Sequence, residues 1–401
     1  MPKEVEQEPE AYREISREVS EQIDYQPPRF FLRRTVCPTF VRKGSDEAPL
    51  TAELPARAVE RGMVGPGLLA AIIIGKYCDH LPLYRQQMIF ETRHQVYLSR
   101  QNMANWMVQA AFWLQPIYEK IAREVMANGY VQLDETPIRY LDPGRGKTGL
   151  GYLWTAHAPG AATFYRWETS RAAQCIENLV PVDFRGWIQC DAYSAYGTFA
   201  RGRGGIALVS CLAHIRRKFF EAKQESPRRA AWVLRQIGHL YRIEKKLREA
   251  KATAVLRQAT RASQSAMIYR RLERAFHKLA ARLLPASAMG KAVSYALSNW
   301  WGLKPWMENG QIEIDNNLVE NAIRPTAIGK KNWLFMGSAH AGQTGAILFT
   351  IIENCRRLGI NPFDYLRDML DRIPPMTNHQ IDELTPEAWA KTSQPEVKRA
   401  A

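Results

Sequence analysis

The sequence predicts an α/β protein in which a mixed sheet is interrupted by a basic, all-helical insertion and preceded by a helical domain. Three observations predict this class. Between residues 130 and 214, strand-like runs first follow one another in hairpins and then alternate with helices. No strand signal occurs in 215–300, where Lys and Arg are abundant. From Gly65 to about residue 125 the apolar pattern has the period of a helix.

Composition favours an ordinary globular protein with an unevenly distributed charge. The 401 residues are 46% hydrophobic and 24% charged, enough for two or three domains of roughly 150 residues. The net charge is +15, and residues 216–282 alone hold 19 Lys and Arg against 5 Glu. Such a concentration suggests a polyanionic partner such as nucleic acid. A solvated helical face is the alternative reading.

Targeting and cysteine signals point to a reduced, cytoplasmic protein that does not enter a membrane. The polar, acidic N-terminus does not have the pattern of a secretory signal. The longest apolar run, 68–75, is well short of the ~20 residues that a bilayer span needs. The six cysteines form no C-x-x-C pair, so they predict neither a disulfide framework nor a four-cysteine zinc site.

The N-terminal third divides into an arm and a helical domain. Residues 1–50 are charged and punctuated by proline, as in a flexible arm, and 51–125 should be helical. Helices are expected over 68–77 and 82–93, and Ser99 is a good N-cap for another from Arg100. This order matches a helix-turn-helix, whose second helix could read bases, although two packed helices would look the same. Its base-reading candidates are Arg100, Gln101, Asn102 and Asn105.

The remaining elements define two halves of a core around the insertion. The first half, 126–214, should hold strands at 130–134, 152–156, 163–167, 187–190 and 206–210, with a helix at 172–179. The insertion covers 215–303. In the second half, 304–372, an Asn309-Gly310 turn should join short strands at 304–307 and 311–314. A helix should then end at Arg324, and further helices should cover about 343–358 and begin at 361. Residues 373–401 are expected to be a loosely structured tail.

Three acidic residues stand out by their positions. Asp134 and Asp191 end apolar strands, and Glu320 lies in a short helix. Carboxylates at strand ends point into the crevice where α/β sheets usually place their sites. Clustered carboxylates need a neutralising charge, and Mg²⁺ takes oxygen ligands while leaving waters that substrate phosphates can replace. The alternatives are turn-forming aspartates and a structural capping box of Asn317 with Glu320.

Five segments carry a resemblance to a known family. They are L-D-E-T-P at 133–137, C-D-A-Y-S-A-Y at 190–196, C-L-A-H-I-R-R-K-F at 211–219, I-D-N-N-L-V-E-N-A-I-R-P at 314–325 and G-K-K-N-W-L-F-M-G-S at 329–338. Through these segments, and from about Gln26 to Asp371, the chain resembles transposases of the bacterial insertion sequence 66 family.

The resemblance implies an RNase H-like fold with a D-D-E triad. Asp134 and Asp191 match its two aspartates and Glu320 its glutamate. The triad would hold two Mg²⁺ ions, for which Mn²⁺ can substitute. The separation of 129 residues from Asp191 to Glu320 would leave room for the helical insertion, which would follow DNA phosphates. Besides the four residues of the predicted recognition helix, the expected DNA contacts are His214, Arg216, Arg217, Lys218, Arg324, Lys330 and Lys331.

Zinc is doubtful at both places where the family suggests it. Members usually begin with a coiled coil and a zinc-binding module with paired cysteines, of which Cys37 is the only visible relic, so 1–50 reads as a remnant of that module. Cys211 and His214 resemble a C-x-x-H signature of several transposases, but two ligands do not complete a zinc site. A structural or DNA-contacting role is preferred for this pair.

The leading hypothesis is a DNA transposase that cuts the 3′ ends of an insertion sequence and joins them to target DNA. Its partners would be double-stranded DNA (terminal repeats and target), further copies of the chain on that DNA, and accessory proteins of the same element. A catalytically silent DNA-binding protein derived from a transposase is the first alternative. A general RNase H-like nuclease, which cuts without joining strands, is the second.

Overall fold

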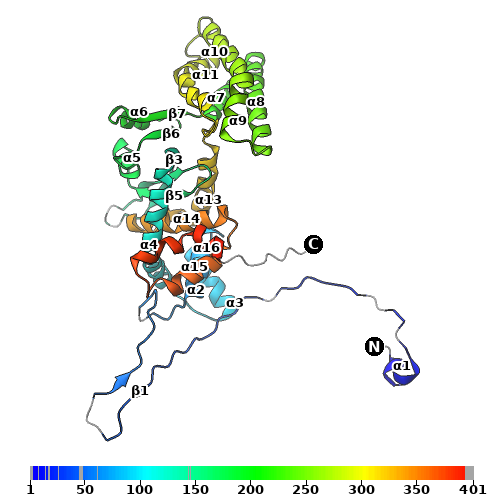
Figure 1. Cartoon of the computed structure of the whole chain (residues 1–401), viewed down its shortest axis with the longest axis vertical. Helices are drawn as coiled ribbons and strands as arrows, with labels where there is room; N and C mark the ends of the chain where they lie inside the picture. The colour runs from blue at the N-terminus through cyan, green and yellow to red at the C-terminus, as the bar shows by residue number, and fades with distance from the viewer. Residues whose placement is uncertain are drawn as a thin grey trace. The chain divides into compact units, whose positions relative to one another are not determined.

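The computed structural model describes residues 3–392 except 8, 14, 17, 18, 26, 45–47, 61, 143 and 145. The chain divides into two units, Met1–Val36 and Cys37–Ala401 (Figure 1). The first unit contains the short helices α1 (Lys3–Gln7) and η1 (Pro9–Ala11), and most of its described residues are exposed. Part of the predicted arm and the last nine residues of the predicted tail lie outside the described residues.

The second unit begins with a short ladder of β1 (Thr39–Phe40) and β2 (Leu50–Thr51), followed by three helices. These helices are α2 (Pro66–Tyr77), α3 (Leu83–His94) and α4 (Arg100–Ala127). The predicted N-cap is confirmed, because the Ser99 side chain accepts a hydrogen bond from the Asn102 N–H at 3.1 Å. The helix extends as far as Ala127 because its apolar face, from Met103 to Val125, is buried.

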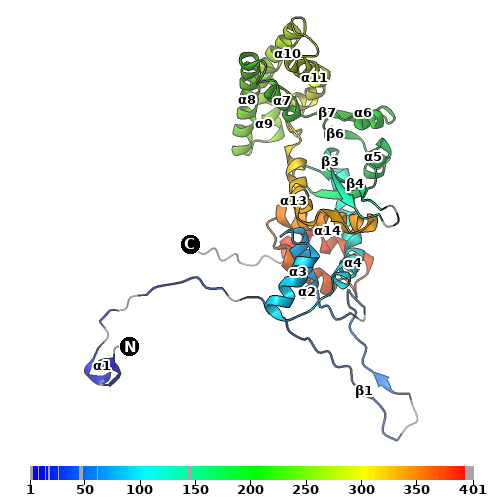
Figure 2. The ribbon, with the colours of Figure 1, turned by 180° about the vertical axis from the view of Figure 1, so that it is seen from behind.

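A mixed sheet follows and forms the centre of this unit (Figure 2). Its strands are β3 (Tyr130–Tyr140), β4 (Gly149–His157), β5 (Thr163–Glu168), β6 (Gly186–Cys190), β7 (Ile206–Ser210) and β8 (Phe335–Met336). The order is β5-β4-β3-β6-β7, with antiparallel pairing on the β4 side of β3 and parallel pairing on the β6 side. The short β8 pairs with the far end of β3. The predicted mixed α/β sheet is therefore confirmed.

Helices cover the sheet and protect its edge. α4 and α14 (Ala339–Arg357) pack against β5, and α13 (Asn317–Trp333) packs against β3 and β4. The free edge of β5 is satisfied by side chains: Thr350 accepts from the Tyr165 N–H, and Asn354 both accepts from and donates to the Thr163 backbone. α5 (Ala173–Leu179) and α6 (Ser194–Arg201) pack together. Covering an edge in this way prevents unwanted strand pairing.

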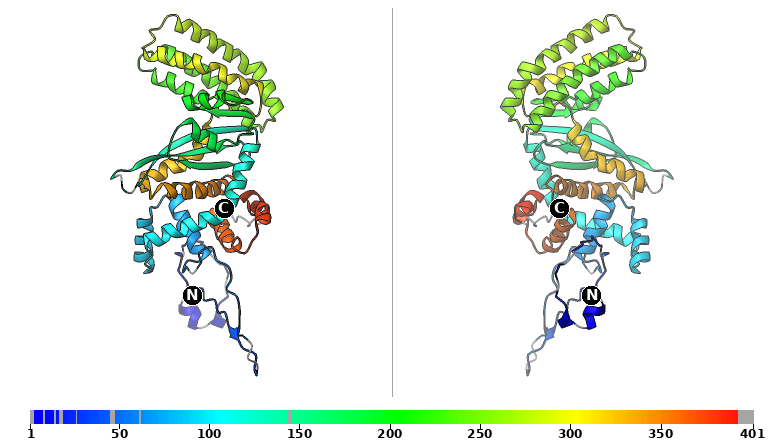
Figure 3. Two further views of the ribbon diagram at one scale, coloured as in Figure 1. Left: turned by 90° about the vertical axis from the view of Figure 1, so that its left-hand side faces the viewer. Right: turned by 90° about the vertical axis from the view of Figure 1, so that its right-hand side faces the viewer.

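From residue 212 to residue 308 the chain is mostly helical and builds its own core (Figure 3). The elements are α7 (Leu212–Glu221), α8 (Pro227–Glu249), α9 (Ala254–Thr260), the π-helical turn η2 (Arg261–Ser265), α10 (Ala266–Ala280), α11 (Ala288–Trp300), η3 (Trp301–Leu303) and α12 (Lys304–Glu308). Aromatic rings organise this core: Phe276 stacks on Phe219 and meets Trp300 edge-on. We call this segment, 212–308, the helical insertion.

The predicted strand pair around Asn309-Gly310 is wrong. Residues 304–308 form α12, because Trp306 is buried against the insertion instead of lying in a ladder. Residues 311–314 are in no strand either. Ile312 and Ile314 are fully buried, which explains the apolar alternation, but side chains of β3 and β6 bind the backbone of this segment where a neighbouring strand would otherwise do so.

Two further predictions, the end of one helix and the loose structure of the tail, are also wrong. α13 does not end at Arg324 but continues through Pro325, because Thr326 and Trp333 are buried and packing outweighs the lost helical hydrogen bond. The predicted loose tail is ordered as far as it is described. After α15 (Pro362–Arg372) come η4 (Asn378–Leu384) and α16 (Pro386–Thr392), whose Trp389 indole donates to Asp368.

Candidate active site

The three predicted acids come from three separate elements of the second unit. Asp134 lies in the middle of β3, so the prediction that it ends a strand is wrong, since β3 extends six residues beyond it to Tyr140. Asp191 directly follows β6, as predicted. Glu320 lies in the first turn of α13. β3 and β6 are parallel neighbours, which places the two aspartates on adjacent strands.

The pKa of Asp134 is raised by its burial and by the neighbouring acidic side chains. Burial raises the pKa of Asp134 to about 8, and the charges of Glu135, Glu320 and Asp191 add to this effect. Only the Glu135 N–H, which donates to Oδ1 at 2.9 Å, favours the ionised form. An acid cluster that is not neutralised by its own protein neighbours is suited to a bound cation.

Glu320 is held by its helix and faces a histidine. The predicted capping box is absent, because Asn316 is the N-cap residue of α13, makes no side-chain cap, and Asn317 is already helical. The Glu320 N–H donates to the Asn316 carbonyl at 3.2 Å. The His214 Nε2 lies 3.8 Å from the Glu320 carboxylate, and both side chains are partly exposed. The first helix of the insertion therefore meets the candidate glutamate directly.

A fourth carboxylate, which the sequence reasoning missed, lies beside the acids. The Glu135 side chain is 2% exposed and is bound by the Arg171 guanidinium and, at 2.8 Å, by the Tyr196 hydroxyl. Arg171 also stacks on the Tyr193 ring at 3.9 Å, and the Tyr193 N–H donates to Asp191. Glu135 is thus already paired with the Arg171 guanidinium. Its place directly after Asp134 was the available signal.

The donor set fits divalent metal ions in its chemistry. All three candidates offer carboxylate oxygens, which Mg²⁺ and Mn²⁺ prefer. Within the described part of the chain, no three His, Cys, Asp or Glu side chains are arranged to hold one ion by themselves. Mg²⁺ usually takes only one or two carboxylates and completes its shell with water and substrate phosphates. These acids therefore fit ions that are shared with a bound phosphodiester.

The basic residues predicted to contact DNA differ in their exposure. Arg216, Arg217, Arg324 and Lys331 are exposed. Lys218 is half-buried, lies over the Tyr295 ring and pairs with Glu221 at 3.5 Å.

Arg216 and Arg217 line a cavity of about 520 Å³ together with Tyr241, Asn317 and Glu320. The same cavity therefore joins two exposed cations to one of the candidate acids.

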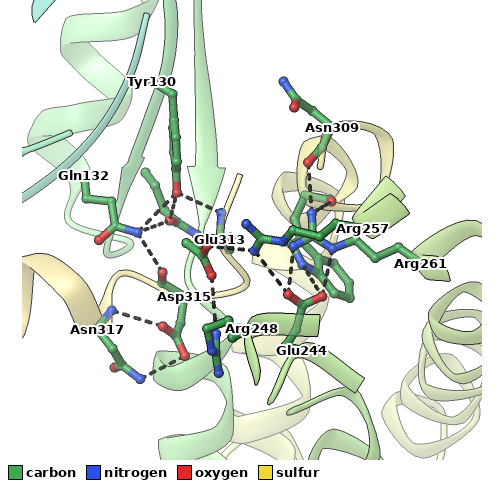
Figure 4. Close-up of polar contacts among 12 residues, drawn as sticks. Tyr130, Gln132, Glu244, Arg248, Arg257, Arg261, Asn309, Glu313, Asp315 and Asn317 are labelled. Atoms are coloured by element: carbon green, nitrogen blue, oxygen red, sulfur yellow. Dashed lines mark hydrogen bonds and ion pairs between the residues drawn. The ribbon is translucent and has the colours of Figure 1, made fainter. Parts of the chain in front are cut away.

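Several cations of the insertion and of α13 are already engaged by the protein. Lys330 donates to the Thr136 hydroxyl and the Pro137 carbonyl, both at 3.0 Å, so it anchors α13 to β3. Arg261 is fully buried with Glu244, and Arg257 binds Glu244 and Glu313 (Figure 4). The prediction that the whole basic surplus faces phosphates is therefore too broad, because part of it stabilises the interior.

Cys211 has a structural place. Burial raises the pKa of its thiol to about 12, and its Sγ accepts a hydrogen bond from the Asn316 N–H at 3.5 Å. A protonated, buried thiol is a poor zinc ligand, since zinc binds the thiolate. Cys211 instead joins the start of α7 to the N-cap of α13, one turn before Glu320.

The predicted recognition helix presents its candidates to solvent. Arg100, Gln101, Asn102 and Asn105 are all exposed on the first turns of α4. The Gln101 amide donates to the Asn105 carbonyl oxygen at 3.0 Å. None of the helices in the described ranges is long and apolar enough to cross a membrane.

Comparisons with known proteins agree with this arrangement. Residues 61–344 match the family described as "Transposase IS66 family", and 350–386 match the "IS66 C-terminal element". Three relatives come from Sinorhizobium fredii (strain NBRC 101917 / NGR234). Uncharacterized protein y4jD is 33% identical over 94% of this chain and 76% of its own length. Uncharacterized protein y4qI is 36% identical over 90% and 68%, and uncharacterized protein y4hP is 29% identical over 96% and 73%.

Proposed function

Because the chain belongs to the IS66 family of transposases, we propose that it cuts the 3′ ends of an insertion sequence and transfers them to target DNA. We further propose that its sheet is an RNase H-like core and that Asp134, Asp191 and Glu320 are the catalytic D-D-E triad. The observation that carries the proposal is the placement of the acids: Asp134 lies on β3, Asp191 directly follows its parallel neighbour β6, and Glu320 lies in the first turn of α13, which packs on β3.

In this proposal the triad would hold two Mg²⁺ ions, or Mn²⁺ in their place. Bound there, the ions would activate water and neutralise charge at the phosphodiester. Asp134 and Asp191 would orient the scissile phosphate from adjacent strands. Glu320 would accept the proton of the nucleophile, and the nearby His214 imidazole would limit the rotation of its carboxylate. Catalysis would consist of positioning and charge neutralisation.

DNA would approach from the side of the insertion. Arg216 and Arg217 line the cavity that also includes Glu320, so phosphates bound there would lie next to the acids. Arg324 is four residues after Glu320 and exposed, which places it on the same side of α13. Lys331 would also contact DNA phosphates, and the exposed residues at the start of α4 would contact the bases. Homo-oligomers on DNA and accessory proteins of the element remain part of the proposal.

The test is a cleavage and strand-joining assay on a duplex that carries the element's terminal repeat. We expect nicking at the 3′ end with Mg²⁺, none with EDTA, and at least a hundredfold loss in Glu320→Gln and Asp134→Asn with DNA affinity nearly unchanged. Glu308→Gln is the matched control, since that carboxylate is 61% exposed and pairs with Lys304 at the surface. Metal-dependent nicking that survives in Asp134→Asn would remove this aspartate from the mechanism.

The same assay separates the two alternatives. A silent DNA-binding protein would bind the repeat without nicking it. A general nuclease would cut unrelated duplexes equally well and would not join strands. The intact acid cluster favours catalysis over silent binding.

A further inference from the structure

Two buried glutamines occupy matching places beside the candidate aspartates. Gln132 on β3 and Gln189 on β6 are partners in the parallel register, and both side chains are fully buried. Each lies two residues before a candidate acid, so Gln132 shares a face of β3 with Asp134. Fully buried amides are costly unless every polar atom finds a partner.

The side-chain amides of these glutamines form hydrogen bonds with the backbone of the segment that leads to Glu320. Gln132 Nε2 donates to the Asp315 carbonyl at 2.9 Å, and Gln132 Oε1 accepts from the Val319 N–H at 3.2 Å. Gln189 Nε2 donates to the Glu313 carbonyl at 2.9 Å. The backbone from Glu313 to Val319 is therefore held by side chains of the two strands that also present the aspartates (Figure 4).

The glutamines are themselves fixed by each other and by a tyrosine. Gln132 Nε2 donates to Gln189 Oε1 at 2.9 Å, and the Tyr130 hydroxyl donates to the same oxygen at 2.6 Å. The Tyr130 hydroxyl in turn accepts from the Glu313 N–H at 3.0 Å. Four backbone groups of the segment are thus bound: the N–H and carbonyl of Glu313, the Asp315 carbonyl and the Val319 N–H.

The segment is paired with no strand. From the side of the insertion, the Leu212 N–H donates to the Ile314 carbonyl at 3.2 Å and Cys211 Sγ accepts from the Asn316 N–H. Residues 309–316 belong to no helix or strand, although Ile312 and Ile314 are completely buried. Buried backbone groups outside a ladder need other partners, and at Glu313, Asp315 and Val319 side chains from β3 and β6 provide them. Val319 directly precedes Glu320, so the hydrogen bond from its N–H to Gln132 lies one residue away from the carboxylate. We call the hydrogen bonds of Gln132 and Gln189 to the 313–319 backbone the grip on this segment.

We infer that Gln132 and Gln189 are positioning residues, which hold the 313–319 segment so that Glu320 faces the two aspartates. This inference rests on the proposed function of the triad. A displacement of the order of 1 Å in a catalytic group can cost about a hundredfold in rate. Loss of the grip should therefore lower the rate of nicking while leaving the DNA-binding surface of the insertion in place.

The test uses the full chain with Gln132→Met and Gln189→Met, which keep the side-chain length and remove the polar atoms. Gln86→Met is the matched control. Gln86 is 2% exposed and donates to the Ile72 and Leu81 carbonyls, far along the chain from the segment. Folding is checked by circular dichroism and thermal unfolding for each variant.

Hydrogen–deuterium exchange tests the grip without reference to activity. In Gln132→Met the Val319 N–H should exchange at least about fivefold faster than in the wild type, the factor that an ordinary hydrogen bond contributes. Gln189→Met should accelerate exchange at the Glu313 N–H, because Tyr130 loses its acceptor. Gln86→Met should change neither. Unchanged exchange across 313–320 in a folded Gln132→Met protein would overturn the inference.

Nicking kinetics test whether the grip matters for catalysis. We expect kcat to fall ten- to a hundredfold in both variants, with the Kd for the terminal-repeat duplex within a factor of two and Gln86→Met like the wild type. A normal kcat together with accelerated exchange would overturn the positioning role. If the wild type does not nick at all, the proposed function fails and the positioning role falls with it, while the exchange data still decide whether the grip exists.

Discussion

The buried ion pair of the helical insertion gives a quantitative stability prediction. Arg261 donates to both carboxylate oxygens of Glu244 at 2.8 Å and to the carbonyls of Trp306 and Asn309 at 2.8 and 2.9 Å. Both charged side chains are fully buried. In Arg261→Met the carboxylate stays buried with only Arg257 and the Trp306 indole near it, both at 3.3 Å.

We expect Arg261→Met to lower the free energy of unfolding by about 3–5 kcal/mol, the usual cost of removing one partner of a buried pair. Glu244→Gln combined with Arg261→Met should recover at least half of this loss, because no buried charge is then left with a missing partner. The measurement is urea unfolding monitored by tryptophan fluorescence. Lys245→Met is the control, since Lys245 is 71% exposed and its change should stay within about 0.5 kcal/mol.

The same ion pair predicts how the stability difference between the wild type and Arg261→Met changes with pH. Burial alone would raise the pKa of Glu244, but the hydrogen bond and charge of Arg261 outweigh it, so the pKa lies below its ordinary value of 4.5. A carboxylate with a lowered folded pKa contributes stability above the unfolded pKa and loses it as the pH falls. The difference between wild type and Arg261→Met should therefore narrow below pH 4.5. The reasoning would be refuted if Arg261→Met lowered the free energy of unfolding by less than about 1 kcal/mol. It would also be refuted if the stability difference between the two proteins became larger as the pH falls.

Three further predictions follow from the site and the sheet. Replacing both Arg216 and Arg217 by Gln should weaken binding to any duplex and make the slope of log K against log salt shallower by about 1.8, from ~0.9 per phosphate contact; an unchanged slope would contradict their role. Burial lowers the pKa of His157 to about 3, so its unfolded form takes up protons below pH 6.5 and stability falls in that range. His157→Asn should flatten that dependence in pH-dependent thermal unfolding, and an identical profile would show that the histidine is not responsible. Arg171→Gln should leave Glu135 without its cation and lower nicking at least tenfold with normal duplex affinity; wild-type turnover would show that the ion pair is dispensable.

The sequence was informative wherever local signals and burial agreed. The Ser99 cap, the strands of the sheet and the all-helical insertion follow from capping chemistry and periodicity. It failed at 304–314, where the apolar alternation of Ile312 and Ile314 reflects burial without a ladder. It failed again at Pro325, because packing of α13 on β3 and β4 outweighs the local preference for a helix end.

The three candidate acids could be predicted from the sequence, but the glutamines that hold the segment before Glu320 could not. Asp134, Asp191 and Glu320 were recognisable from their surrounding motifs, yet periodicity contains no information on contacts between residues so far apart. Gln132 and Gln189 carried one usable signal, a polar residue at a position where a buried strand should be apolar. That signal does not identify a partner, since the groups they bind lie 183 and 124 residues away along the chain.

These long separations along the chain affect when the candidate site forms during folding. The bond from Gln132 to Val319 closes a loop of 187 residues, and contacts of such high contact order are expected to form late in folding. The hairpins of β3, β4 and β5, by contrast, join neighbours in sequence. During synthesis both aspartates leave the ribosome well before Glu320 exists. An unfinished or partly folded chain therefore holds an incomplete acid set, and the proposed DNA cleavage should appear only once the entire insertion has folded.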